Sequence, residues 1–259
     1  MVENRNQLLK KMNTRTLLKS LVLVGIVGSM PAMAQTVTPT GPNKVYIEQV
    51  GNLNTVTIEQ VGVANTVGGV GVGGASNTNY GTITGSSNTL AITQTGDGNT
   101  AQYNIKGNTN TYTSTVTGSS NSTKLTIGTA VAVTNLRNTV TETISGDSNT
   151  VVQNIVGNDI SSTLSITGDN NEVNKDLLSS NGTSNVTITG NTNLFNIQQQ
   201  DGGTHSLTAT VTGDSNSITT QQQGSNATTF GIAVNGAHNT ITVRSSNTSI
   251  ATPLTAVAR

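Results

Sequence analysis

The sequence predicts an all-β fold, a two-sheet β-solenoid built from strand–turn half-repeats of about 11 residues, with about 22 residues per coil. Three observations predict it. One unit is written twice in the stretch VYIEQVGNLNTVTIEQVGVANT, residues 45–66. Apolar and polar residues alternate within each unit, as in a strand with one buried face. Each unit then ends in a turn of the form G-x-x-N.

The composition excludes an ordinary globular protein with a thick core. Only 32% of the residues are hydrophobic, 2% are aromatic and 9% are charged, and there are 28 glycines. Disordered chains usually carry more charge than this one, so a thin, hydrogen-bonded and repetitive structure fits better. The chain has no cysteine, which excludes disulfides and thiolate metal sites.

Residues 1–34 are predicted to be a secretory signal peptide. Basic residues precede the apolar segment Leu17 to Val27, and Ala32-Met33-Ala34 forms an A-x-A cleavage site before Gln35. Met12 is an alternative start, because the sequence from Met12 already contains all three regions. Removal of residues 1–34 takes away five of 12 basic and one of 12 acidic residues, which leaves a charge of about −4. The mature chain therefore offers no basic patch for nucleic acid.

The mature chain divides into three parts. Residues 35–44 contain two prolines and no alternation, so we expect an extended leader. Residues 45–252 carry the repeats, and residues 253–259 form a C-terminal tail in which Pro253 departs from the template.

Turn glycines recur at intervals of about 11 or 12 residues. They are Gly51, Gly62, Gly74, Gly85, Gly96, Gly107 and Gly118, and then Gly146, Gly157, Gly168, Gly190, Gly213, Gly224 and Gly236.

An asparagine follows most of these glycines three residues later. Gly and Asn both tolerate positive φ, and an Asn amide can bond both its own turn and the Asn stacked above it. We therefore expect asparagine ladders at Asn54, Asn65, Asn77, Asn88, Asn99, Asn110, Asn121, Asn149, Asn171, Asn193, Asn216 and Asn239.

Three segments break the rhythm. GTAVAVTNLR, residues 128–137, inserts about six residues. LLSSNGTS blurs the turn at residues 177–184, and Asp201-Gly202-Gly203 replaces another turn. Each is interpreted as a loop that bulges from one corner of the solenoid.

The repeat pattern I-x-Q-x-G-x-x-N closely resembles the repeats of curlins, the secreted bacterial subunits of curli amyloid fibres. YIEQVGNLNTVTIEQVG and LAITQTGDGNTA carry the resemblance, which is close over residues 45–110 and looser to residue 247. It implies that Gln49, Gln60, Gln94, Gln199 and Gln222 form inward ladders. Val116, Ile144 and Val211 stand where the family has glutamine.

The resemblance also implies a function and a location. It implies a non-enzymatic fibre subunit of a biofilm matrix, exported through an outer-membrane pore and assembled outside a Gram-negative-type bacterium. The expected partners are other copies of the chain and related curlin-like subunits. No cofactor, metal, nucleic acid or small-molecule substrate is expected. The sequence leaves open whether the chain is a major subunit or a nucleator, and which end grows.

Other candidate sites are weak. Gly69 to Gly74 match G-x-G-x-x-G, but no helix follows. His205 and His238 are interpreted as solvated turn residues. Asp97, Asp147, Asp169 and Asp214 each follow a turn glycine, which favours a turn role over calcium binding. Glu142 and Lys175 fall at inward positions, which indicates either an error of register or a nearby bulge, because unpaired buried charges are costly.

The outward positions support an alternative function. If units alternate between two sheets, one sheet collects threonines and the other collects larger polar and charged residues. A flat array of T-x-T resembles the ice-binding face of solenoidal antifreeze proteins, although threonine is also favoured on exposed strands. The threonines are Thr111, Thr113, Thr115, Thr117, Thr139, Thr141, Thr143, Thr163, Thr167, Thr187, Thr189, Thr208, Thr210 and Thr212, and the other sheet holds Gln102, Lys106, Lys124, Asn154, Glu172 and Asn196.

Overall fold

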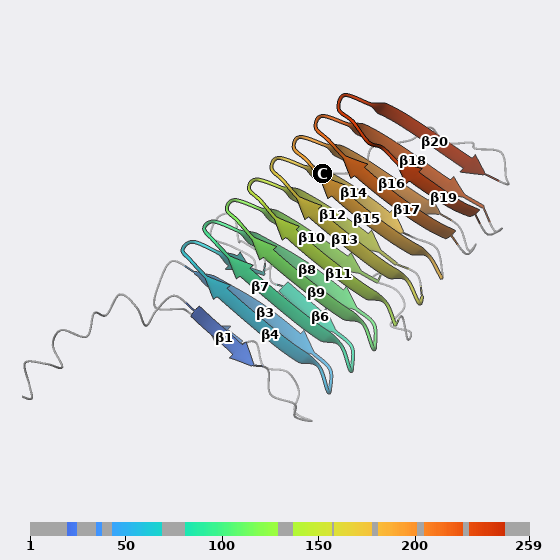
Figure 1. Cartoon of the computed structure of the whole chain (residues 1–259). Coiled ribbons are helices and arrows are strands. Elements are labelled where there is room, and N and C mark those ends of the chain that lie inside the picture. Colours follow the sequence, from blue (N-terminus) through green and yellow to red (C-terminus); the bar gives the residue numbers. More distant parts are fainter. Residues whose placement is uncertain are drawn as a thin grey trace, which may run out of the picture.

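The chain folds into an elongated stack of coils with two parallel β-sheets facing each other (Figure 1). This computed structural model describes residues 20–24, 35–37, 43–68, 81–128, 137–156, 158–177, 181–200, 205–224 and 228–246. Within these ranges no helix is long and apolar enough to span a membrane. The predicted two-sheet β-solenoid is confirmed.

Twenty strands make up the described fold. The first five are β1 (Ser20–Val24), β2 (Gln35–Val37), β3 (Lys44–Val50), β4 (Thr55–Val61) and β5 (Thr66–Val67). They are followed by β6 (Gly81–Thr84), β7 (Thr89–Thr95), β8 (Thr100–Lys106), β9 (Thr111–Thr117), β10 (Ser122–Ile127), β11 (Thr139–Ser145), β12 (Thr150–Ile155), β13 (Ser161–Thr167), β14 (Glu172–Leu177), β15 (Thr183–Thr189), β16 (Leu194–Gln200), β17 (His205–Thr212), β18 (Ser217–Gln223), β19 (Thr228–Ala233) and β20 (Thr240–Ser246).

From β6 to β20, successive strands alternate between the two sheets. Sheet A has the order β1-β4-β7-β9-β11-β13-β15-β17-β19. Sheet B has the order β2-β3-β5-β8-β10-β12-β14-β16-β18-β20, and β6 also pairs with β3 and β8 in this sheet. All pairings are parallel except β1 with β4 and β2 with β3, which are antiparallel. From β3 to β20, each chain segment therefore pairs with the segment one coil away.

The spacing of equivalent residues in consecutive coils confirms the predicted period. Asn121 lies one coil after Asn99 and follows it by 22 residues in the sequence. Asn138 lies one coil after Asn110 but follows it by 28 residues, which confirms the predicted insertion in this coil. The coil that contains residues 201–203 is one residue longer than the period.

All three predicted irregularities fall at the same corner of the solenoid. We call the turns that lead from sheet A to sheet B the A→B corner, and those that lead back the B→A corner. Residues 129–136, 178–180 and 201–204 lie outside the described residues, and each segment follows a sheet-B strand and precedes a sheet-A strand. The A→B corner keeps G-x-x-N in every coil, from Gly62 to Asn239. The breaks therefore lie at a corner, as predicted, and all three share the B→A corner.

One predicted unit does not form a level of its own. We predicted a turn at Gly74 and Asn77, which lie outside the described residues. β5 and β6, on either side of this segment, occupy one level, because β3 and β8 each pair with both. Asn54 and Asn88, at equivalent positions of consecutive coils, are consequently 34 residues apart. β5 and β6 therefore share one level of sheet B, although the glycine spacing between them follows the period of the repeat.

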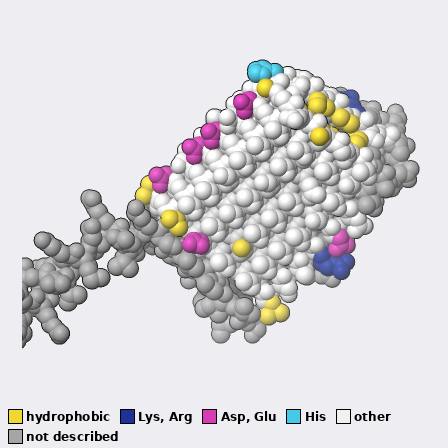
Figure 2. Space-filling view, in the orientation of Figure 1, with side chains coloured by type: hydrophobic (Ala, Val, Ile, Leu, Met, Phe, Trp, Pro, Cys, Tyr) yellow, Lys and Arg dark blue, Asp and Glu magenta, His cyan; other side chains and the backbone are white. Residues whose placement is uncertain are grey.

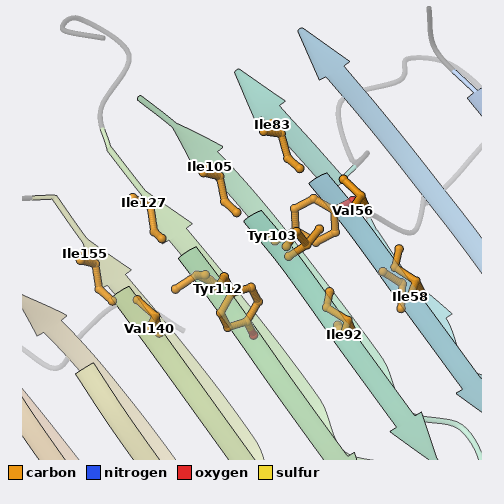
Figure 3. Close-up of a cluster of buried hydrophobic side chains, with 14 of the residues drawn as sticks. Val56, Ile58, Ile83, Ile92, Tyr103, Ile105, Tyr112, Ile127, Val140 and Ile155 are labelled. Atoms are coloured by element: carbon orange, nitrogen blue, oxygen red, sulfur yellow. The ribbon is translucent and has the colours of Figure 1, made fainter. Parts of the chain in front are cut away.

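The core is a narrow layer between the sheets. In the strands the alternate residues point inward, as predicted, and stack on equivalent residues of the next coil. Figure 3 shows one such column, in which Ile83, Ile105, Ile127 and Ile155 lie in line. The buried apolar residues form two clusters along the stack. Each buried apolar side chain packs against others either across this layer or along its own column.

The turns require glycine for two reasons. Twelve of the predicted turn glycines are described, all except Gly74 and Gly157, and their φ lies between 102° and 134°. A Cβ on Gly118 would also lie 2.0 Å from the carbonyl oxygen of Gly146 in the next coil. The asparagines themselves are not in the left-handed region, because the positive φ falls on the residue before them, such as Ser120.

Replacement of a turn glycine should therefore destabilise the stack. We expect Gly118→Ala to lower the free energy of unfolding by about 2–4 kcal/mol, because it adds backbone strain and a clash with the next coil. Gly98→Ser is the matched control, since Gly98 has φ 67° and the equivalent residues are Ser120 and Ser148. Urea unfolding followed by circular dichroism measures both. Equal losses in the two variants would contradict the role of the close contact.

Candidate functional site at the corners and ends of the solenoid

The A→B corner holds an unbroken column of asparagines, all buried except the half-buried Asn239 at the last coil. From Asn99 onward, the backbone N–H and the side-chain Nδ2 of each asparagine both donate to Oδ1 of the asparagine one coil before. For Asn121 these bonds reach Asn99 at 3.0 Å each, and Nδ2 also donates to the Gly146 carbonyl at 2.7 Å. The column contains Asn43, Asn65, Asn99, Asn121, Asn149, Asn171, Asn193, Asn216 and Asn239.

The B→A corner holds a shorter column. It runs through Asn54, Asn88, Asn110 and Asn138 with the same geometry. It ends where Ile160 takes the next position and donates only its backbone N–H to Asn138, at 3.3 Å.

Two members of these columns were not predicted. Asn43 and Asn138 have no turn glycine three residues before them, so the G-x-x-N rule missed both. The signal that could have found them is an asparagine directly before the first residue of a strand.

The inward glutamines form two separate pairs. Gln60 donates to Gln94 at 3.0 Å in sheet A, and Gln199 donates to Gln222 in sheet B. Gln49 joins neither pair, because it is half-buried and lies beside Ile83. The predicted glutamine ladder is therefore two pairs near opposite ends of the stack, and apolar residues continue the columns between them.

Glu142 and Lys175 are buried in regular strands. Both occupy inward positions with an unbroken register, so neither a register error nor a bulge explains them. Glu142 accepts hydrogen bonds from Ser114 at 2.9 Å, Gln153 at 2.9 Å and Tyr112 at 3.4 Å. The carboxyl group is thus solvated by side chains of the neighbouring strands instead of by water.

The two charged residues are linked through other side chains. Lys175 donates to Ser162, which donates to Gln153 at 3.2 Å. Burial raises the pKa of the Glu142 carboxyl, although its hydrogen bonds and the Lys175 charge oppose this rise. Burial lowers the pKa of Lys175 to about 7, and the Glu142 charge opposes this fall. This polar network connects β9, β11 and β13 of sheet A to β12 and β14 of sheet B.

The two histidines have different surroundings. His205 is buried, which overturns its interpretation as a solvated turn residue. It stands at the asparagine position of the B→A corner, and its Nε2 lies 3.0 Å from the Gln200 carbonyl. His238 is an exposed turn residue, as predicted.

The aspartates that follow turn glycines have a turn role. Asp147 accepts the Ser119 backbone N–H at 2.6 Å, and Asp97, Asp169 and Asp214 accept equivalent bonds. Among the described residues no three acidic or histidine side chains are arranged to hold a metal ion. The glycine motif at residues 69–74 lies outside those residues.

The predicted segregation of outward residues is confirmed. Every threonine of the predicted array lies on β9, β11, β13, β15 or β17 of sheet A, and Gln102, Lys106, Lys124, Asn154, Glu172 and Asn196 all lie on sheet B. Figure 2 shows a broad face with few charged or hydrophobic side chains and a row of acidic side chains along one edge.

The two ends of the stack differ. At the N-terminal end β1 covers the edge of β4, and β2 covers the edge of β3. We expected the leader, residues 35–44, only to be extended, and the pairing of β2 was not predicted; β1 lies within residues 1–34, the predicted signal peptide. At the C-terminal end β19 and β20 have no further strand partner in the described part of the chain. Phe230 and Ile241 are only half-buried there, although the equivalent Leu207 and Ile218 one coil earlier are buried.

No family model, curated protein or solved structure matches the chain.

The asparagine column should contribute strongly to stability. We expect Asn121→Ala to lower the free energy of unfolding by about 2–4 kcal/mol, because it leaves the buried backbone N–H of Asn149 and the Gly146 carbonyl unpaired. Asn154→Ala is the control, because Asn154 points outward from β12. Urea unfolding of both variants tests the expectation, which fails if Asn121→Ala costs no more than the control.

The polar network should make stability depend on pH. Unfolded Lys175 keeps its proton up to a pKa of about 10.5, whereas burial lowers the pKa of the folded residue to about 7. The unfolded state therefore binds more protons between these values, and stability rises with pH there. From pH 7 to 9.5 we expect a gain of about 3 kcal/mol. The double variant Glu142→Gln with Lys175→Met should lose this rise in urea unfolding, and an unchanged pH profile would contradict the assignment.

Proposed function

We propose that the chain is a secreted structural subunit of a curli-like extracellular amyloid fibre that grows by end-to-end stacking of solenoids. The observation that carries the proposal is the state of the C-terminal end. β19 and β20 present a row of backbone groups with no described strand partner, and half-buried apolar side chains lie beside them. Such an edge can pair with another chain.

The stacked columns support an interface between two copies. In the described coils the asparagine donates backward and accepts forward, so Asn239 at the last coil offers Oδ1 to an incoming donor of the same kind. In the second copy, Asn43 occupies the first position of that column. The contact joins different surfaces of the two copies, and contacts of this kind generate filaments when they do not close.

The N-terminal end must open before such a contact forms, and cleavage of the proposed signal peptide, residues 1–34, removes β1 from the edge of β4. β2 occupies the edge of β3 that the incoming strand would use. It pairs over only the three residues Gln35–Val37, whereas β3 has seven. In this proposal a second copy displaces β2 by parallel pairing along the whole of β3. Export through an outer-membrane pore and association with related subunits belong to the same proposal.

A second candidate function is surface or ice binding by sheet A. The observation that favours it is the confinement of the threonine array to this sheet, whose outward charges in the described strands are limited to Glu59. The array needs no second copy, so a monomer would bind.

The two functions separate in one experiment on purified residues 35–259. The fibre predicts a lag phase, growth of Thioflavin-positive fibres that seeds accelerate, and diffraction spacings of about 4.8 Å and about 10 Å. Ile241→Lys places a charge in the open end and should abolish seeded growth without unfolding the monomer. Thr242→Lys, which points outward on the same strand, is the control. A non-associating monomer that shows thermal hysteresis would contradict the fibre and support the second candidate.

A further inference from the structure

A buried amine and a buried amide stand in the same inward column of sheet B. They belong to Lys175 on β14 and Gln153 on β12, which are paired residues of neighbouring parallel strands. Both side chains are fully buried. Lys175 is also the last lysine of the sequence. An amine and a carboxamide are thus held one coil apart in the core.

One serine contacts both groups. Ser162, on β13 of the opposite sheet, accepts a hydrogen bond from Nζ of Lys175 and donates one to Oε1 of Gln153 at 3.2 Å. Its hydroxyl therefore holds the amine next to the amide carbonyl and withdraws electron density from the carbonyl oxygen. A donor in this position stabilises the negative charge that attack on the carbonyl carbon places on that oxygen.

The amide nitrogen of Gln153 contacts an acid. Its Nε2 donates to Oε2 of Glu142 at 2.9 Å, while Ser114 and Tyr112 donate to the other carboxyl oxygen. Burial raises the pKa of Glu142 and lowers the pKa of Lys175 to about 7. Burial thus favours an uncharged amine, which is nucleophilic, and a carboxyl group that carries a proton for the nitrogen it contacts.

We propose that Lys175 and Gln153 condense after folding to form an intramolecular isopeptide bond. Nζ of Lys175 attacks Cδ of Gln153, so an Nζ–Cδ bond forms and the Cδ–Nε2 bond breaks. Glu142 gives a proton to Nε2, which leaves as ammonia. One Nζ proton stays on the new amide and the other restores the Glu142 carboxyl group. The atoms balance without any further reactant.

The bond joins two consecutive coils of sheet B. It closes a covalent loop from residue 153 to residue 175 that contains β13 of sheet A. Like a disulfide, such a cross-link stabilises mainly by restricting the unfolded chain. The buried amine also becomes an uncharged amide, so the rise of stability with pH that the free Lys175 amine produces should disappear once the bond has formed.

Peptide mapping of folded, purified residues 35–259 tests the bond. After denaturation, cleavage at glutamate releases residues 143–172 and 173–259 separately from a chain without the bond, because Glu142 and Glu172 are the last two glutamates. With the bond, we expect one branched product, lighter than their sum by one ammonia, and fragmentation that places the branch at Gln153 and Lys175. Two separate peptides, or a branch at another residue, would overturn the proposal.

Two lysine variants control for the site. Lys175→Met keeps a long side chain in the column and should yield only separate peptides. Lys124→Met, on the outward face of β10, should still yield the branched product. The opposite result in either variant would overturn the assignment. An N-terminal Gln35 also loses ammonia when it cyclises, so the peptides decide and the intact mass does not.

Time courses test the role of Glu142. In Glu142→Gln an oxygen still accepts from Nε2 of Gln153, but the side chain no longer transfers a proton. When chains collected in urea before folding are diluted, we expect this variant to form the branched product at least about 100-fold more slowly than the unaltered chain. An equal rate would overturn proton transfer by Glu142, and a bond that also forms in urea would overturn the requirement for the fold.

Circular dichroism shows whether each variant has refolded. If Glu142→Gln does not refold, Ser162→Ala is the second variant, because it removes the donor to Oε1 of Gln153. We expect it to slow the same step by about 100-fold. An unchanged rate in refolded Ser162→Ala would overturn the role of the hydroxyl.

Discussion

The whole structure depends on hydrogen bonding between consecutive coils. Each strand gives its outward N–H groups to the coil after it and its inward N–H groups to the coil before it. A single coil therefore satisfies few of its own backbone groups, and its thin apolar face buries little surface. Stability arises only when many coils share one register. Strand edges at the two ends of the stack follow necessarily from this geometry.

The corners keep that register because they permit only one spacing. Consecutive turn glycines approach so closely that a Cβ on Gly146 would meet the Gly168 carbonyl at 2.1 Å. The adjacent asparagines donate two bonds to the coil before and accept two from the coil after, so a displaced coil would leave buried amides unpaired. Near the middle of the stack, the buried Glu142 and Lys175 reach their hydrogen-bonding partners in only one register of the coils. Polar groups thus restrict the register of stacking, while apolar columns such as the one in Figure 3 lie between the two sheets.

Much of the fold could be predicted from the sequence, because period and turn chemistry are local. Alternation in VYIEQV and the G-x-x-N turns were enough to predict two sheets, their segregated faces and the longer coil after Gly118. The separate unit at Gly74 was wrong, because GVGVGG satisfies the same local rule while its neighbours share one level. Asn138 was missed as a member of the asparagine column, and His205 was wrongly predicted to be a solvated turn residue. Their positions depend on the corner lengths, which are known only once the register of the paired strands is known. The partners of Glu142 lie up to 30 residues away in sequence, so no local pattern could find them.

The two corners of the solenoid differ in regularity. One corner repeats without exception and carries the long asparagine column, while the other accepts extra residues in several coils and its column stops at Ile160. Foreign peptides inserted between β10 and β11, or between β16 and β17, would enter the chain at this one corner and not within the strands that carry the outward threonines. The solenoid thus has one corner of constant length and one corner that tolerates insertions.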